Sequence, residues 1–280
     1  MGHEIAGTVT EVGDVVTSVS EGDRVAVNNR IPCNDCQYCE QGKFHLCTAR
    51  DGSVLEIPGF ADEMVIQESS AVPIPEGTSI RQAALTEPLS VSVHAVRRSE
   101  MQIGDTVVVI GAGPIGLGIV NAASAAGADR TLVSEPNATR RQAASKLGAS
   151  VTLDPTDVDI VERIEELTDG GADAAFECAG VESTFKQALR TTKYDGTVVV
   201  LSVFEDAISV HPNTVVQTER TIHGSFAYCG DYEATLQMMQ DGRLNPETMI
   251  TDVVKLNKIE TGFERLTDTA GNDIKILIEP

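Results

Sequence analysis

The 280-residue chain is poor in basic residues. Its 21 Lys and Arg face 42 Asp and Glu, which gives a formal net charge of −21, and lysine contributes only 7 of the 21. Binding of nucleic acid or of an anionic membrane surface depends on clusters of basic side chains. The charge therefore argues against both classes of partner.

The chain also lacks a long apolar run. Its longest apolar stretch, residues 107–120, contains four glycines and Pro114, whereas a membrane-spanning helix needs about 20 apolar residues. The N-terminus has no basic segment followed by an apolar core, so no signal peptide is visible. With 41% hydrophobic residues a sizeable core can form. These features predict a folded cytoplasmic protein without a membrane segment.

The acidic residues are spread along the whole chain and do not form a tail. Carboxylates distributed in this way keep a protein soluble by mutual repulsion, and halophilic proteins use this property. The alternative is an ordinary acidic cytosolic protein. We expect a salt-adapted, halophilic protein, because such an excess of charge destabilises a compact state unless salt screens it.

Four of the six cysteines lie within fifteen residues, at positions Cys33, Cys36, Cys39 and Cys47. In a chain without a signal peptide, such a cluster indicates metal binding. Four thiolates around Zn²⁺ form a closed tetrahedral site that has a structural role. An iron–sulfur cluster and disulfides are the alternatives, although the usual iron–sulfur spacings differ. The sequence thus predicts a structural zinc site.

The residues before position 106 fall into two patterns. Residues 5–12 and 24–27 alternate apolar and polar side chains, and residues 59–66 continue this β-rich pattern. From Ile80, apolar residues recur at helical spacing up to Val96.

Residues 106–226 alternate short apolar strands with helices, which predicts a buried, doubly wound parallel sheet of six strands. The expected strands are 106–110, 131–134, 151–153, 173–177, 197–202 and 221–226. The expected helices are 115–126, 138–147, 158–167, 183–191 and a short one near 213–218. The tail adds expected helices at 232–240 and 259–266 and extended segments at 253–256 and 274–278, which must pack outside this sheet.

The first expected strand of this sheet leads directly into a glycine motif, Gly111 to Gly116. In dinucleotide-binding proteins the first glycine permits a tight turn, the second (here Gly113) lets a pyrophosphate approach the backbone, and the third lets helix and strand pack closely. Pro114 and Ile115 begin the helix, whose free N–H groups attract phosphate. The motif predicts a dinucleotide cofactor.

Glu135 ends the second expected strand, 19 residues after Gly116. A carboxylate there accepts hydrogen bonds from ribose hydroxyls and repels a 2′-phosphate, which favours NAD over NADP. Arg140 and Arg141 follow closely, and an arginine can accept that phosphate. The alternative is that both arginines belong to a solvated helix face.

These motifs occur in a characteristic order: Gly2-His3-Glu4, the four cysteines, Glu87-Pro88 and then the glycine motif. In this order the whole chain resembles the zinc-dependent medium-chain alcohol dehydrogenase family. Residues 87–99, 176–182, 202–205 and 224–228 are most similar to the (R,R)-2,3-butanediol dehydrogenases.

The resemblance implies a second, catalytic zinc held by His3 and Glu87, with Glu4 as a possible exchangeable ligand. The family's catalytic cysteine lies before Gly-His-Glu, and the chain begins at Met1. We therefore expect a late start site or an N-terminal truncation, which leaves the activity of this chain open. Cys178, Val203, Ser225 and Phe226 end the last three strands and are expected on the nicotinamide side of the cofactor.

The implied fold is α/β: a β-rich, GroES-like catalytic lobe (residues 1–88), a six-stranded Rossmann domain (89–226), and a segment returning to the lobe (227–280). The implied function is hydride transfer between NAD and a secondary alcohol or vicinal diol, such as 2,3-butanediol and acetoin. Threonine 3-dehydrogenase, polyol dehydrogenase and glucose dehydrogenase remain alternatives, as does a catalytically silent NAD-binding chain with structural zinc. The implied partners are a small-molecule substrate and further copies of the chain, in a homodimer or homotetramer.

Overall fold

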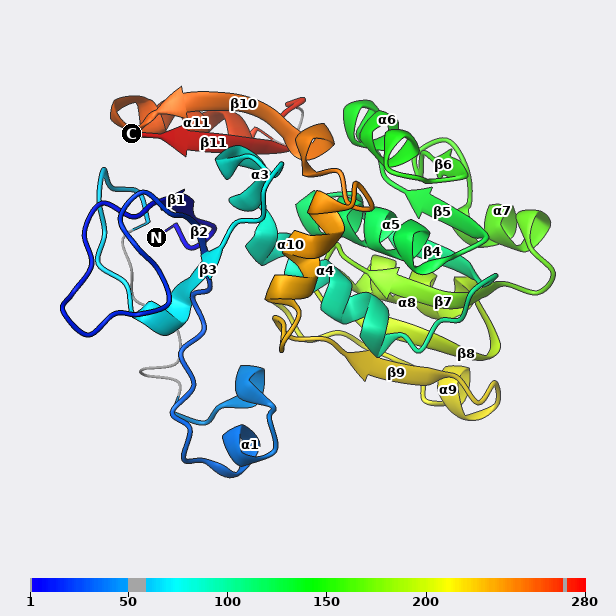
Figure 1. Cartoon of the computed structure of the whole chain (residues 1–280). Helices are drawn as coiled ribbons and strands as arrows, with labels where there is room; N and C mark the ends of the chain where they lie inside the picture. Colours follow the sequence, from blue (N-terminus) through cyan, green and yellow to red (C-terminus); the bar gives the residue numbers. More distant parts are fainter. Residues whose placement is uncertain (1, 50–58, 269–270) are drawn as a thin grey trace. The chain divides into compact units, whose positions relative to one another are not determined.

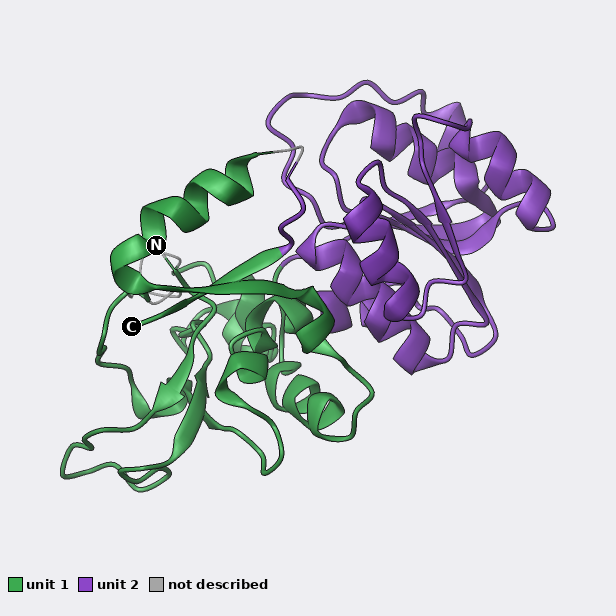
Figure 2. Cartoon of the chain, turned by 90° about the horizontal axis from the view of Figure 1, so that it is seen from above, with its two compact units in different colours: residues 1–91, 227–268, 275–280 green, residues 92–226, 269–274 purple. Residues whose placement is uncertain are grey.

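A computed structural model describes residues 2–49, 59–268 and 271–280. The chain divides into two compact units (Figure 2). Unit 1 contains Met1–Val91, Ala227–Asp268 and Lys275–Pro280, and unit 2 contains Ser92–Phe226 and Thr269–Ile274. Among the described residues, no helix combines the length and the apolar character needed to cross a bilayer.

Unit 2 is built on one parallel sheet of six strands in the order β6-β5-β4-β7-β8-β9 (Figure 1). Its strands are β4 (Thr106–Ile110), β5 (Arg130–Ser134), β6 (Val151–Leu153), β7 (Ala172–Glu177), β8 (Thr192–Val200) and β9 (Thr221–Gly224). The connecting helices are α5 (Pro114–Ala126), α6 (Ala138–Lys146), α7 (Ile160–Leu167), α8 (Glu182–Thr191) and α9 (Asn213–Val216). The chain reverses its direction of travel across the sheet between β4 and β7, which is the usual cofactor crevice of this fold. The predicted six-stranded parallel sheet is confirmed.

The core of unit 2 explains why these segments become strands. Val108 and Leu132 on the sheet are fully buried and pack with Ile164 of α7 and Leu189 of α8. Strands covered by helices must be apolar on both faces, and this produces the continuous valine-rich runs of the sequence.

Unit 1 contains a small antiparallel sheet in the order β1-β2-β3. Its strands are β1 (Ala6–Thr8), β2 (Arg24–Val27) and β3 (Ala71–Pro73). The helical part that follows consists of α3 (Ile80–Ala83) and α4 (Thr86–Arg98), and α4 begins in unit 1 and ends in unit 2. The cysteine segment forms two short helices, α1 (Gln37–Glu40) and the 3-10 helix η1 (Phe44–Leu46).

Most of the tail belongs to unit 1, and its two strands pair with each other outside the six-stranded sheet, as expected. Helix α10 (Tyr232–Gln240) precedes a two-stranded parallel sheet of β10 (Ile250–Lys255) and β11 (Lys275–Glu279), with α11 (Ile259–Thr267) between them in the chain. Helix α11 lies against this sheet at Gly262, next to the side chains of Val254 and Ile276.

Two expectations about local structure are wrong. Residues 59–66 form no strand, although their pattern alternates; Val65 is 95% exposed, whereas Phe60, Ala61, Met64 and Ile66 are partly buried without a strand partner in the described chain. Strand β8 begins at Thr192 instead of residue 197. Between the pairs Ala172–Thr192 and Ala174–Thr197 it contains three extra residues, and Asp195 in this irregular part has a left-handed backbone conformation.

The acidic residues lie on the surface, as the composition suggested. Among the described acidic side chains, only Glu87, Glu135, Glu177 and Asp231 are buried. We expect the melting temperature to rise by about 10 °C or more between low salt and molar KCl, because the Debye length falls from ~10 Å at 0.1 M to ~3 Å at 1 M and repulsion is screened. Thermal unfolding followed by circular dichroism tests this, with isosmotic sucrose as the control. An unchanged melting temperature would refute the salt adaptation that we expect.

Candidate functional sites

The four clustered cysteines converge in unit 1, with sulfur atoms that all lie within 4.8 Å of one another. The Sγ atoms of Cys33 and Cys36 lie 3.9 and 3.6 Å from that of Cys39. These separations are too long for a disulfide bond of about 2.05 Å, and all six cysteines are free thiols. Four sulfurs held tetrahedrally at about 2.3 Å from zinc lie ~3.8 Å apart. The geometry therefore fits one zinc ion.

The backbone around the cluster is also arranged for thiolates. The N–H of Cys33 donates to Sγ of Cys47 (3.5 Å), and the N–H of Cys36 donates to Sγ of Cys33 (3.4 Å). Hydrogen bonds from the backbone N–H of Thr48 and then of Cys39 lower the pKa of Cys36 to about 5. Burial raises the pKa of Cys39 to about 12. Ionisation of all four thiols needs a compensating cation, which a zinc ion supplies.

A second group of possible metal ligands, His3, Glu4 and Glu87, also lies in unit 1. One donor atom from each lies within 4.8 Å of the others, and Nε2 of His3 is 3.9 Å from Oε2 of Glu87. Imidazole with carboxylates is a donor set that suits zinc. The structure thus brings together the three residues that the sequence selected.

The N-terminal segment at Gly2, which precedes His3, is held in place by contacts with Gly59 and Phe60. The N–H of Gly59 donates to the carbonyl oxygen of Gly2 (3.2 Å). A Cβ on Gly59 would lie 2.3 Å from that oxygen, so only glycine permits this approach. The ring of Phe60 packs on Gly2 and meets Phe263 edge-to-face, at 5.8 Å between centroids. His3 therefore follows an anchored residue instead of a frayed end.

Glu87 lies in the first turn of α4 and is only 6% exposed. Burial, and then the negative charge of Glu4, raises the pKa of Glu87 to about 7; the charges of Arg30 and Lys275 act in the opposite direction. Glu4 itself forms an ion pair with Lys275. A buried carboxylate beside a second one is costly without a cation, which fits a metal ion at this place.

The glycine motif forms a tight turn in unit 2 between β4 and α5. Gly111 has a φ of +93°, which favours glycine, and a Cβ on Gly116 would lie 2.0 Å from the carbonyl oxygen of Gly111. A Cβ on Gly113 would meet no atom of the described chain within 4 Å. The open space beside Gly113 is consistent with the close approach of a pyrophosphate to the backbone. Pro114 and Ile115 begin α5, as expected.

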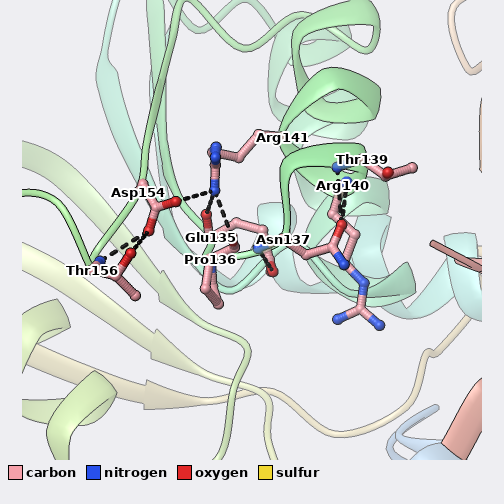
Figure 3. A network of polar contacts seen from close by, with 8 residues as sticks. All are labelled: Glu135, Pro136, Asn137, Thr139, Arg140, Arg141, Asp154 and Thr156. Carbon is pink, nitrogen blue, oxygen red and sulfur yellow. Dashed lines mark hydrogen bonds and ion pairs between the residues drawn. The ribbon is translucent and has the colours of Figure 1, made fainter. Parts of the chain in front are cut away.

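Glu135 is buried beside this turn (Figure 3). Its Oε2 accepts a hydrogen bond from the N–H of Ala112 (2.7 Å), and its Oε1 accepts one from the N–H of Asn137 (2.9 Å). The carboxylate is thereby fixed next to the glycine motif, where a ribose lies in dinucleotide-binding folds.

The two arginines near Glu135 have different environments (Figure 3). Arg141 forms an ion pair with Asp154 (2.8 Å) and donates to the carbonyl oxygens of Glu135 and Pro136 (2.7 Å each). The side chain of Arg140 points away from Glu135. The side chain of Arg141 therefore stabilises the turn at Glu135 and Pro136, after β5.

The four residues expected near the nicotinamide follow strands β7, β8 and β9, which are neighbours in the sheet. Ser225 is buried and its N–H donates to the carbonyl oxygen of Val200 (2.9 Å). Val203 and Phe226 are 88% and 49% exposed. Burial, and then the charge of Glu177, raises the pKa of Cys178 well above its usual value. The raised pKa favours the neutral thiol form of Cys178.

Glu177 is a residue whose role the sequence did not reveal. It is fully buried at the end of β7. Its Oε1 accepts hydrogen bonds from the N–H groups of Ala179 (2.9 Å) and Gly180 (2.8 Å) and from the hydroxyl of Thr184 (2.8 Å). It holds the turn that carries Cys178. Its position at the end of a strand, like that of Glu135, is the one feature of the sequence that could have indicated a buried carboxylate that stabilises a turn.

Comparison with known proteins places these sites in context. The zinc-binding dehydrogenase family matches residues 114–241, and the alcohol dehydrogenase GroES-like domain matches residues 1–76. The (R,R)-butanediol dehydrogenase of Bacillus subtilis is 36% identical over 284 residues, and the sorbitol dehydrogenase of the same organism is 30% identical over 286 residues. Each match covers 100% of this chain and 80% of the relative. The crystal structure of 2R,3R-butanediol dehydrogenase from Bacillus subtilis aligns with a TM-score of 0.92 and 35% identity, over 100% of this chain and 80% of that one.

Proposed function

Because the chain belongs to the zinc-binding dehydrogenases with an alcohol dehydrogenase GroES-like domain, a family of oxidoreductases, we propose that it oxidises a secondary alcohol or vicinal diol with NAD. The pair that we favour is 2,3-butanediol and acetoin. The observation that carries this proposal is the convergence of His3, Glu4 and Glu87 within 4.8 Å in the lobe that also holds the four cysteines.

In this proposal His3 and Glu87 hold the catalytic zinc, and Glu4 is an exchangeable ligand. When bound, zinc acts as a Lewis acid on the alcohol oxygen, and NAD accepts the hydride. The chain's own contribution is to position the ligands: Gly2 and Gly59 anchor the segment before His3, α4 presents Glu87, and Lys275 holds Glu4. The four-cysteine zinc has a structural role.

The preference for a diol rests on the relatives. Both the butanediol and the sorbitol dehydrogenase match the whole chain, and the first does so at the higher identity. A panel of 2,3-butanediol, sorbitol, threonine and glucose, each assayed with NAD and with NADP, tests the assignment. We expect the highest kcat/KM with 2,3-butanediol and NAD. Activity on sugars alone, or with NADP alone, would overturn it.

The NAD preference leads to a prediction about Glu135. Replacing Glu135 with glutamine removes the charge that repels a 2′-phosphate while keeping an acceptor for Ala112. We expect the ratio of NADH to NADPH affinity to fall about 10- to 100-fold, from the loss of one close charge–phosphate interaction. Fluorescence titration of both reduced cofactors measures this ratio. Glu162→Gln, at an exposed position of α7, is the matched control. An unchanged ratio in Glu135→Gln would contradict the assignment.

A further inference from the structure

The ion pair between Lys275 and Glu4 lies beside the second group of possible metal ligands in unit 1. The side chains of Lys275 and Glu4 are 17% and 26% exposed. Those of Lys255 and Glu279, which form an ion pair on the two-stranded sheet of the tail, are 61% and 51% exposed. Water screens an exposed ion pair more strongly than a shielded one. The contact with Lys275 therefore restrains the carboxylate of Glu4.

The direction of the Lys275 side chain follows from its strand. Lys275 is the first residue of β11, and its carbonyl oxygen accepts a hydrogen bond from the hydroxyl of Thr251 on β10 (3.0 Å). The next residue, Ile276, faces α11, where a Cβ on Gly262 would lie 3.8 Å from it. Because successive side chains of a strand point to opposite faces, Lys275 points away from α11. The strand thus presents the ammonium group to Glu4.

Glu4 has a second possible partner in a bound metal ion. One donor atom of Glu4 lies within 4.8 Å of donor atoms of His3 and Glu87, so its carboxylate is close to a metal ion on those two residues. An ammonium group has three donors and no acceptor, and it binds a carboxylate but not a metal ion. Lys275 and the metal ion therefore compete for the carboxylate of Glu4.

We propose that Lys275 is a positioning residue that holds Glu4 off the metal ion and so keeps a coordination position available to the alcohol substrate. A catalytic zinc needs such an open position, and a carboxylate that stays bound competes with the substrate for it. The ion pair makes Glu4 an exchangeable ligand instead of a permanent one. This inference rests on the proposed dehydrogenase function and adds the residue that controls one of its metal ligands.

The test measures the zinc affinity of the second site in the full chain, by competition with a chromophoric chelator after the four-cysteine site has been loaded. We expect Lys275→Met to raise this affinity about tenfold or more, because the freed carboxylate of Glu4 adds a charged ligand. The KM for the alcohol substrate is expected to rise about tenfold, because Glu4 then competes with it. Lys275→Gln loses the same charge and is expected to behave like Lys275→Met, whereas Lys275→Arg keeps a cation and is expected to match the wild type.

The same substitution in a Glu4→Gln background separates competition for a ligand from simple charge repulsion. Removal of a positive charge acts on the metal ion in either background, whereas the competition that we propose requires the carboxylate of Glu4. In the Glu4→Gln background we therefore expect Lys275→Met to change the zinc affinity less than about threefold.

Lys255→Met is the matched control, since it removes a lysine from an exposed ion pair on the same sheet; its zinc affinity and KM are expected to match the wild type. Melting temperatures show whether each variant is folded. An unchanged or lower zinc affinity in Lys275→Met and Lys275→Gln, or an equal rise in the Glu4→Gln background, would overturn this inference alone. If the wild type binds no second zinc, or oxidises no alcohol with either cofactor, the proposed function itself fails.

Discussion

Replacement of Glu87 by glutamine is expected to lower turnover by about a thousandfold or more, because Lewis-acid catalysis contributes several kcal/mol to stabilisation of the transition state. Glutamine keeps the size of the side chain but removes the negative charge that a metal ion requires of this ligand. The buried position of Glu87, 6% exposed in the first turn of α4, leaves little room for a replacement ligand. We expect one zinc ion fewer per chain in this variant.

Two further measurements make this prediction specific. NADH binding is expected to remain unchanged, because the glycine motif and Glu135 belong to unit 2, whereas Glu87 belongs to unit 1. Glu233→Gln is the matched control, since Glu233 is an exposed glutamate in the first turn of another helix of unit 1, α10. Full turnover in Glu87→Gln, or an equal loss in Glu233→Gln, would exclude Glu87 as a zinc ligand.

Replacement of Cys39 by serine is expected to unfold the cysteine segment. Cys39 is buried and its sulfur is near those of both Cys33 and Cys36. A structural zinc site contributes directly to folding, because its ligands are brought together only in the folded state. We expect loss of the structural zinc and a melting temperature lower by about 10 °C or more.

The other cysteine of unit 1 provides the control. The thiol of Cys229 donates to the carbonyl oxygen of Gly42 (3.0 Å). Cys229 therefore contacts the cysteine segment but is not one of the four clustered cysteines. A serine at position 229 can make the same hydrogen bond, so Cys229→Ser is expected to retain its zinc and its melting temperature. Zinc content determined by atomic absorption, together with thermal unfolding, distinguishes the variants. If Cys39→Ser retains the full zinc content, the four cysteines do not form the site.

Patterns of local sequence were sufficient for much of the fold. The valine-rich strands, the glycine turn and the spacing of the cysteines can each be recognised within a short stretch of sequence, and the six-stranded sheet followed from them. Residues 59–66 show the limit of this reasoning. Their pattern predicted a strand, but a strand also needs a partner, and no local pattern reveals whether one is present.

The candidate catalytic site was only partly predictable, for a similar reason. His3, Glu4 and Glu87 were selected because a family resemblance connects residues that are more than 80 positions apart, whereas composition and periodicity gave no signal for them. Lys275 reaches the same lobe from the tail. Contacts of this range are set by tertiary packing, so the ion pair of Glu4 with Lys275 became visible only in the folded chain.

The central claim is that a second zinc ion, held by His3 and Glu87, is required for activity. Measurement of zinc content together with turnover tests this claim most directly. We expect about two zinc ions per chain, one structural and one catalytic. Controlled chelation should remove the more accessible ion first, and NAD-dependent oxidation of a secondary alcohol should fall in proportion and return when zinc is restored. A chain that binds a single zinc and NADH but shows no turnover, or one that keeps full turnover after the second zinc is removed, would contradict this account.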